Sequence, residues 1–154
     1  METVRLESRA SAYMEPRVTL SGIAQGDRIC VRISVEFQGD VEQPNVGFML
    51  RNRLGEDVAG TNVMHEGMRL PAAHSGDRLS VDFIMDLPLL QAGFYHFSPA
   101  IADSDLSQYE MCDWIDNACA IEINQQVITY GHLRIPTRVR AMTVLDNRLQ
   151  AVLE

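Results

Sequence analysis

Paired carboxylates are the residues of this sequence whose types and spacing most readily suggest chemistry. Asp103 stands two positions before Asp105, and Asp113 stands three positions before Asp116. A glycosidase uses two carboxyl groups roughly 5–10 Å apart across a cleft, and clustered loop acids also suit calcium. The EF-hand spacing is absent and the glycosidase match is loose, so we expect these acids mainly to be solvated or to cap turns.

Composition removes several other kinds of catalytic site. The chain has no lysine, and all 13 of its basic residues are Arg, which excludes a Walker A lysine, a Schiff base and a Ser–Lys pair. Arg suits planar hydrogen bonding to anions and hydroxyls, although a preference for Arg codons explains the same composition. The sequence has no GxSxG, CxxC or HxxxH pattern. We therefore expect no catalytic residue, no metal site and no cofactor.

Length and charge indicate one domain over residues 1–154 that does not bind nucleic acid. The formal charge is -8, which disfavours contact with phosphate backbones. No apolar run approaches the roughly 18 residues of a membrane helix, and the charged start lacks the apolar region of a secretory signal. Cys30, Cys112 and Cys119 have no disulfide-framework spacing, so we expect reduced, mostly buried thiols in a cytoplasmic protein.

The remaining elements are organised around Asn45–Asn62. Val46, Phe48 and Leu50 alternate with Gly47, Met49 and Arg51, and a polar turn with Gly55 follows, which predicts a β-hairpin. Gly47 and Gly60 lie inside its strands, where Gly costs stability unless a bulge or a close neighbour needs it.

Similar alternation recurs in short runs along the chain. The predicted strands are 1–13, 17–23, 28–37, 78–85, 94–101, 118–123, 127–133 and 138–144. Residues 103–117 are expected to form an acidic loop with one helical turn near 111–115. Short strands with frequent turns and no long helix predict an all-β, immunoglobulin-like antiparallel β-sandwich, with a jelly roll as the alternative fold.

Two further features leave alternatives open. No Arg lies between Arg78 and Arg134, and no acid lies between Glu122 and Asp146. The two segments either neutralise each other or provide an Arg-lined anion or sugar site. Trp114 is interpreted as a core anchor with a bonded N–H in preference to a platform on which a sugar stacks.

Several short motifs resemble, in order and spacing, the C-terminal domain of Wzt-type ATPase subunits of O-polysaccharide ABC transporters. The motifs are Val46-Gly47-Phe48 through Arg53-Leu54-Gly55, Gly60-Thr61-Asn62, Gly93-Phe94-Tyr95 and Asp113-Trp114-Ile115-Asp116-Asn117-Ala118. The resemblance covers most of residues 1–124. It implies an immunoglobulin-like sandwich that binds the finished, non-reducing end of a lipid-linked O-antigen polysaccharide at the cytoplasmic face of the inner membrane before export.

The resemblance also implies partners. The full subunit of such a transporter carries an ATPase domain and works with a transmembrane subunit, so the chain is expected to be a separated, non-catalytic domain with Met1 as an artificial start. The matching motifs are structural, so the resemblance does not identify any binding residues. The alternatives are a structural or oligomerisation module and, less favoured, a glycosidase.

The remaining predictions concern the binding face and the tail. Polar residues expected to point outward from strands are the candidate carbohydrate-binding residues: Arg51, His96, Ser98, Tyr130, His132 and Arg134. In the tail, from Arg138 onward, apolar groups occupy both faces of the predicted strand. Such a strand on a solvated edge invites pairing, and Pro136 provides a hinge before it. We therefore expect a homodimer in which the last strand is exchanged or shares an edge with the partner, the alternative being a strand folded back on its own chain.

Overall fold

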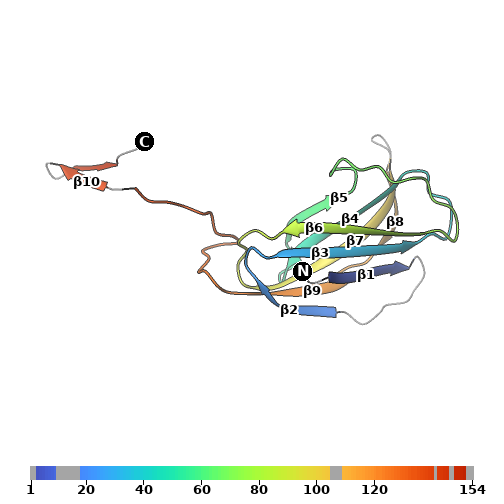
Figure 1. Cartoon of the computed structure of the whole chain (residues 1–154), viewed down its shortest axis with the longest axis horizontal. Coiled ribbons are helices and arrows are strands. Elements are labelled where there is room, and N and C mark those ends of the chain that lie inside the picture. The colour runs from blue at the N-terminus through green and yellow to red at the C-terminus, as the bar shows by residue number, and fades with distance from the viewer. Residues whose placement is uncertain (1–2, 10–17, 105–108, 141, 146–147, 152–154) are drawn as a thin grey trace.

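Alternating apolar residues produce strands that stack as two sheets (Figure 1). The structure is a computed structural model, and it describes residues 3–9, 18–104, 109–140, 142–145 and 148–151. The strands are β1 (Thr3–Arg9), β2 (Val18–Ala24), β3 (Arg28–Glu36), β4 (Pro44–Asn52), β5 (Asp57–Asn62), β6 (Arg78–Asp86), β7 (Gly93–Ser104), β8 (Tyr109–Trp114), β9 (Cys119–Asn124), β10 (Met142–Leu145) and β11 (Arg148–Ala151). The described residues contain no helix, and so none long and apolar enough to cross a membrane.

The smaller sheet has the order β1-β3-β6, and the larger has the order β2-β9-β7-β4-β5, with β8 also paired to β7. This arrangement confirms the predicted all-β sandwich. The pairing is not wholly antiparallel, because β1 runs parallel to β3 and β2 runs parallel to β9. The N-terminal part of the chain therefore contributes one edge strand to each sheet. A register shift interrupts β2 between Leu20 and Ile23, where Gly22 has φ +84°.

The core lies between the two sheets. On β4, Val46, Phe48 and Leu50 are all buried, as their alternation predicts. The Phe48 ring contacts Phe83 of the smaller sheet and Phe97 of its own sheet edge-to-face, with centroids 5.2 and 5.3 Å away. Phe48 therefore joins the two layers through an aromatic cluster of favourable geometry.

The outer face of the smaller sheet carries ion pairs that run directly across from β3 to β6. Arg28 lies opposite Asp86 and Arg32 opposite Asp82, and each guanidinium binds both oxygens of its partner, at 2.6 and 3.0 Å and at 2.6 and 2.7 Å. These bonds lower the pKa of both carboxyls below the ordinary value. The charges on this face are thus largely satisfied by one another.

The length of β7 shapes the larger sheet. The first part of this 12-residue strand pairs with β9, from Gly93 to Phe97, and its second part pairs with β8, from Ala100 to Ser104. Two successive strands therefore flank the same side of β7, and the turn between them lies next to Ser98. The predicted helical turn in residues 111–115 is wrong, because these residues belong largely to β8.

The chain after β9 differs from its prediction. No strand forms over residues 127–133, apart from an isolated bridge between Leu90 and Leu133. Residues 134–140 are exposed and lead away from the sandwich (Figure 1). The predicted strand 138–144 is observed only in its last part, because β10 begins at Met142. Among the described strands, β10 and β11 pair only with each other.

Candidate functional site

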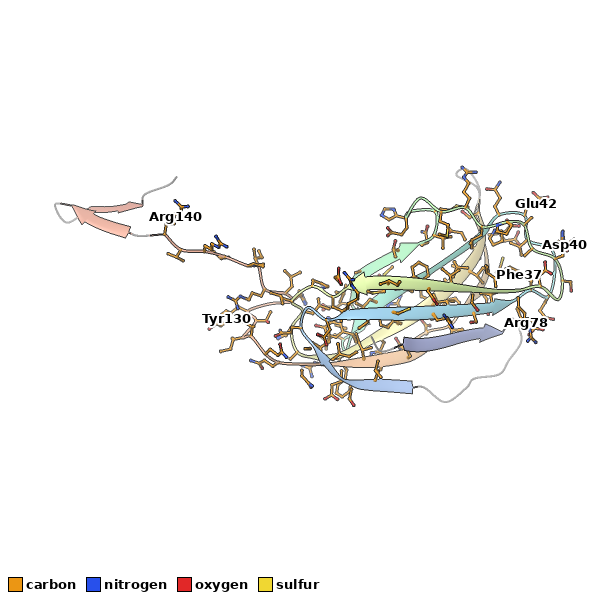
Figure 2. All side chains as sticks on the ribbon, viewed as in Figure 1. Phe37, Asp40, Glu42, Arg78, Tyr130 and Arg140 are labelled. Atoms are coloured by element: carbon orange, nitrogen blue, oxygen red, sulfur yellow. The ribbon has the colours of Figure 1, made fainter. Side chains whose placement is uncertain are left out.

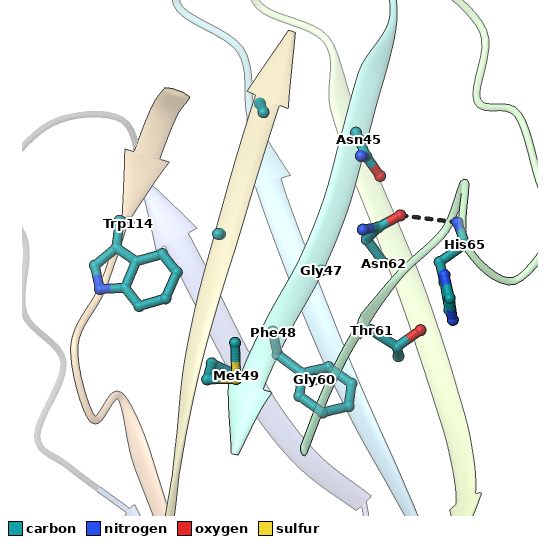
Figure 3. Close-up of a pocket in the computed structure, with 11 residues that line it drawn as sticks. Asn45, Gly47, Phe48, Met49, Gly60, Thr61, Asn62, His65 and Trp114 are labelled. Atoms are coloured by element: carbon teal, nitrogen blue, oxygen red, sulfur yellow. Dashed lines mark hydrogen bonds between the residues drawn. The ribbon is translucent and has the colours of Figure 1, made fainter. Parts of the chain in front are cut away.

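A groove of about 390 Å³ lies on the outer face of the larger sheet, over β5, β4, β7 and β8 (Figure 3). Its size falls within the range of small-molecule sites, roughly 300–1,000 Å³. Small residues form the floor: Gly47 on β4 lies opposite Ala100 on β7, and Ala102 follows two positions later on β7. Because these side chains are short, the sheet surface is hollow here instead of being covered by its own residues.

Two glycines keep the groove open. A Cβ added to Gly47 would lie 2.5 Å from the Thr61 carbonyl oxygen, and one added to Gly60 would lie 2.9 Å from the Met49 sulfur. Both distances are shorter than real contacts allow, so any larger residue would force β4 and β5 apart or displace Met49. The close neighbours that the sequence analysis required for these two glycines are therefore present.

The groove has a polar and an apolar side. Asn45, Asn62 and His65 lie on the side of β5, and Met49 and Trp114 lie toward β8 (Figure 3). The Asn62 side-chain oxygen accepts a 2.8 Å hydrogen bond from the His65 backbone amide. This division suits a ligand that is polar on one face and apolar on the other, as a sugar ring is.

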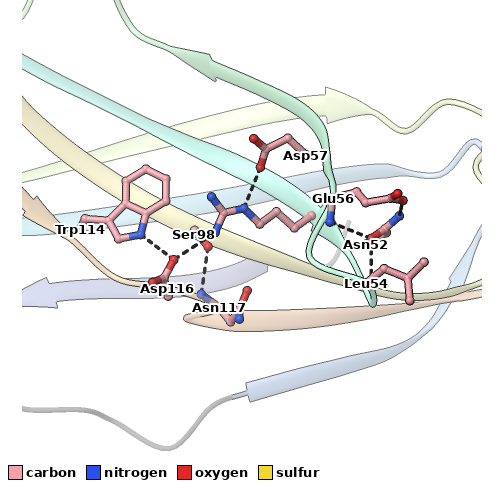
Figure 4. A network of polar contacts seen from close by, with 9 residues as sticks. Asn52, Leu54, Glu56, Asp57, Ser98, Trp114, Asp116 and Asn117 are labelled. Atoms are coloured by element: carbon pink, nitrogen blue, oxygen red, sulfur yellow. Dashed lines mark hydrogen bonds and ion pairs between the residues drawn. The ribbon is translucent and has the colours of Figure 1, made fainter.

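Trp114 is half-buried and lines the groove, so the interpretation as a core anchor is wrong, although its N–H is bonded as predicted. The indole Nε1 donates a 2.7 Å hydrogen bond to Asp116 Oδ1 (Figure 4). The same oxygen accepts a 3.1 Å bond from Arg51 Nη1, and Arg51 Nε donates at 2.7 Å to Asp57. The Arg51 guanidinium also lies 5.5 Å from the centre of the Trp114 ring. Three other side chains, Asp116, Arg51 and Asp57, thus fix the ring at one end of the groove.

Three of the six predicted binding residues lie together beside the groove. Arg51 is paired with His96 across β4 and β7, and Ser98 follows two positions later on β7. The predicted exposure of Ser98 is wrong: its side chain is fully buried, and its hydroxyl accepts a 2.9 Å hydrogen bond from the Asn117 amide. Strand alternation placed Ser98 on the correct face but could not show that the turn after β8 covers it.

The other three predicted residues are placed differently. Tyr130, His132 and Arg134 are exposed, lie outside any strand and do not line the groove. This segment is held on the corner between β6 and β7, because the Gln91 amide donates to the His132 carbonyl and the Arg134 amide donates to the Leu89 carbonyl. Figure 2 shows Tyr130 near the point where the chain leaves the sandwich. The structure therefore does not bring these residues together with Arg51 and His96.

The carboxylates that suggested catalysis have structural contacts. Asp103 accepts hydrogen bonds from the backbone amides of Glu42 and Gln43, and Asp116 is bound by Trp114 and Arg51. Asp105 lies outside the described residues. Among the residues that the structure describes, no Asp or Glu lines the groove, and no cluster of three or more His, Cys, Asp or Glu side chains could hold a metal ion.

Three acids of the acidic segment form ion pairs with Arg residues outside the basic segment. From the acidic segment, Asp86 pairs with Arg28, Asp82 with Arg32 and Asp116 with Arg51. All three Arg residues precede the acidic segment, whereas the sequence suggested Arg134, Arg138 and Arg140 as partners. The register of β3 against β6 sets the first two pairs, and the turn after β8 brings Asp116 to Arg51.

Comparison with known proteins gives one family and one fold. The model of the family described as "Wzt C-terminal domain" matches residues 14–135. The structure is similar to a solved structure described as "Crystal structure of the C-terminal domain of wzt", with a TM-score of 0.69 and 16% sequence identity over 77% of this chain and 72% of that chain. No curated protein gives a significant sequence match.

Proposed function

The chain belongs to the Wzt C-terminal domain family, and from this we propose that it is a non-catalytic carbohydrate-binding module of an O-antigen ABC transporter. It recognises the non-reducing terminus of a lipid-linked O-antigen polysaccharide and couples that recognition to export. The observation that carries the proposal is the groove over Gly47 and Ala100, with Trp114 at one end. Sugar-binding sites commonly combine an aromatic surface with a few fixed polar groups.

Some residues around the groove contact the sugar, and others hold the surrounding backbone in place. Trp114, Met49 and Asn62 line it and contact the sugar. Arg51 and His96 lie further along the same sheet face, where a second sugar unit extends the contact. Ser98 is a support residue, since its buried hydroxyl holds the covering turn. The exposed residues Tyr130, His132 and Arg134 are not part of this site.

Binding of purified domain to O-polysaccharide from its own source tests the proposal. Isothermal titration calorimetry is expected to give saturable binding, which Trp114→Ala weakens at least tenfold, about 1.4 kcal/mol. Ile84→Ala is the matched control, because Ile84 is exposed on the outer face of the other sheet. Absence of binding to any soluble or lipid-linked polysaccharide from that source would contradict the proposal.

Export in cells tests the coupling step. The full-length subunit works at the cytoplasmic face of the inner membrane with a transmembrane subunit and an ATPase domain. Variants that no longer bind the polysaccharide are therefore expected to stop its export while leaving the protein folded. Continued export by such variants would favour the second candidate, a module with a purely structural or oligomerising role.

The exposed tail supports a homodimer. Ile135 and Val139 are 74% and 85% exposed on a chain segment that leaves the sandwich, so this segment offers apolar side chains that its own sandwich does not cover. The occupant is a second copy, with the tail sharing an edge of its partner or exchanging the last strands. Light scattering is expected to show a dimer for the intact chain at tens of micromolar and a monomer for a chain ending at Ile135. A monomeric intact chain, or an unchanged dimer after truncation, would contradict it.

A further inference from the structure

The groove carries almost no charge in a protein whose net charge is -8. Within the described part of the chain, its lining contains no Asp, Glu, Arg or Lys, and His65 is the only ionisable side chain that lines it. His65 is exposed, and an ion pair at such a position is weak. An anionic ligand would therefore lose hydration without gaining a strong cationic partner.

The Arg51 guanidinium, which lies beside the Trp114 ring, is already neutralised. Arg51 is bonded to both Asp57 and Asp116, with nitrogen–oxygen distances of 2.7 and 3.1 Å. On the polar side, the Thr61 hydroxyl donates to the Glu66 carboxylate, which places a negative charge next to the groove. Both arrangements disfavour a carboxylate, phosphate or sulfate on the bound sugar.

One polar atom in the groove lacks a partner. The Asn45 Oδ1 atom is buried and, among the described residues, accepts no hydrogen bond. A buried acceptor without a donor is costly, and most buried polar groups in proteins are paired. Oδ1 itself is covered, but Asn45 lines the groove, so rotation of its amide about the Cβ–Cγ bond would present Oδ1 to a ligand. A ligand that donates to Oδ1 would then remove this cost and gain affinity.

We propose that the groove selects an electrically neutral terminal sugar that donates a hydroxyl or acetamido hydrogen bond to Asn45 Oδ1, and that it rejects acidic sugars and anionic caps. This inference rests on the proposed carbohydrate-binding function. It adds that the bound sugar is uncharged and that Asn45 accepts a hydrogen bond from it. The apolar side, with Trp114, Met49 and Ala100, accepts the nonpolar face or a methyl group of the same sugar.

A glycan array of neutral and anionic termini, probed with the intact domain, tests the charge class. The glycans include unmodified hexoses, 6-deoxyhexoses and N-acetylhexosamines on one side, and uronates, sialylated, phosphorylated and sulfated termini on the other. All binding termini are expected to be neutral, with affinities that change less than twofold between 50 and 500 mM NaCl, since salt screens only charged contacts. Binding by hexoses alone or by acetamido sugars alone identifies which donor reaches Asn45.

Two substitutions at Asn45 test the hydrogen bond separately from the charge. Asn45→Asp keeps an acceptor of the same size and is expected to retain binding within about threefold, whereas Asn45→Leu removes the acceptor and is expected to lose about tenfold. Asn124→Leu, an exposed position on β9 away from the groove lining, is the matched control and leaves binding unchanged. The melting temperature of each variant shows whether it folds. If Asn45→Leu does not fold, the hydrogen bond is tested with Asn45→Asp alone.

The outcomes separate this inference from the function on which it rests. Preferential binding of anionic termini would overturn the neutral-sugar inference and leave carbohydrate binding intact. Abolition of binding by a folded Asn45→Asp variant would overturn the role of Asn45 as an acceptor. Equal binding by Asn45→Leu and the unsubstituted chain would overturn the role of Asn45. No binding to any terminus, together with no binding to the source polysaccharide, would overturn the carbohydrate-binding function itself.

Discussion

Trp114 and Arg51 both donate a hydrogen bond to the same oxygen, Asp116 Oδ1, and the Arg51 guanidinium lies 5.5 Å from the centre of the indole ring. Trp114 is the chain's single tryptophan, so its fluorescence reports directly on one end of the groove. Arg51 also forms an ion pair with Asp57, whereas the indole N–H donates its hydrogen bond to Asp116. Trp114 should therefore depend on Asp116 more than on Asp57.

Asp116→Ala is expected to loosen the Trp114 ring. Its emission should move to longer wavelength and its quenching by acrylamide should increase, because the indole loses its hydrogen bond and becomes more exposed to water. Asp57→Ala is the matched control, since it breaks an Arg51 ion pair without touching Trp114. Global stability should change by no more than about 0.5 kcal/mol in either variant, as surface changes usually do. Identical spectra for the two variants would show that Asp116 does not position the ring.

Phe48→Ala is expected to destabilise the fold by about 3–5 kcal/mol, the usual cost of removing a core phenylalanine. The ring is 8% exposed and contacts Phe83 and Phe97, so its loss opens a cavity between the two sheets. Urea unfolding followed by circular dichroism measures the change. Ile84→Ala, next to Phe83 but 62% exposed, should cost less than about 0.5 kcal/mol. An unchanged unfolding midpoint for Phe48→Ala would be inconsistent with this packing.

Much of the sandwich was predictable because strand alternation records which face is buried. Ile29, Val31, Ile33 and Val35 on β3 are buried, and residues 45–62 form the predicted hairpin. β8 was missed because it carries acids and has one described strand neighbour, β7. Its residues Glu110, Met111 and Cys112 are exposed, so the sequence shows no buried stripe there.

The candidate site was harder to predict because its floor is made of small residues. Sequence reasoning selected large polar side chains such as Arg51 and His132, whereas the groove exists where Gly47, Ala100 and Ala102 leave space. Their meeting depends on the register of β4 against β7, which no local pattern gives. The signal available in the sequence was Gly47 inside a strand, since an interior glycine marks a close approach of backbone or ligand.

Gln25 is expected to hold the segment after β9 on the sandwich. This residue is 7% exposed; its Nε2 donates to the Leu90 carbonyl and to Thr129, and its Oε1 accepts from the amides of Gln126 and Val127. Gln25→Ala should cost about 1–3 kcal/mol, because buried groups lose their partners. Hydrogen exchange at the Val127 amide should accelerate more than exchange in β7. The exposed Gln126 side chain provides the control, and Gln126→Ala should leave both measurements unchanged.

The three thiols are expected to react in an order set by exposure and charge. Cys30 and Cys119 are buried and Cys112 is exposed, and burial raises the pKa of Cys119 to about 12. Since the thiolate is the reacting form, Cys119 holds almost no thiolate at pH 8, and its reactivity should stay low until the pH approaches 12 or the protein unfolds. Desolvation by neighbouring atoms and the nearby acids also raise the pKa of Cys112, so this exposed thiol should react slowly at pH 7 and faster as the pH rises.

Iodoacetamide labelling of the native protein at pH 8, followed by peptide mass spectrometry, measures this order. Cys112 should be alkylated first, while Cys30 and Cys119 should become reactive together in urea. Cys112→Ser should abolish labelling of the native protein and leave labelling in urea at the other two sites. Rapid alkylation of Cys119 in the folded protein would mean that β9 opens locally, and it would contradict the close pairing of Cys119 with Phe97 across β7 and β9.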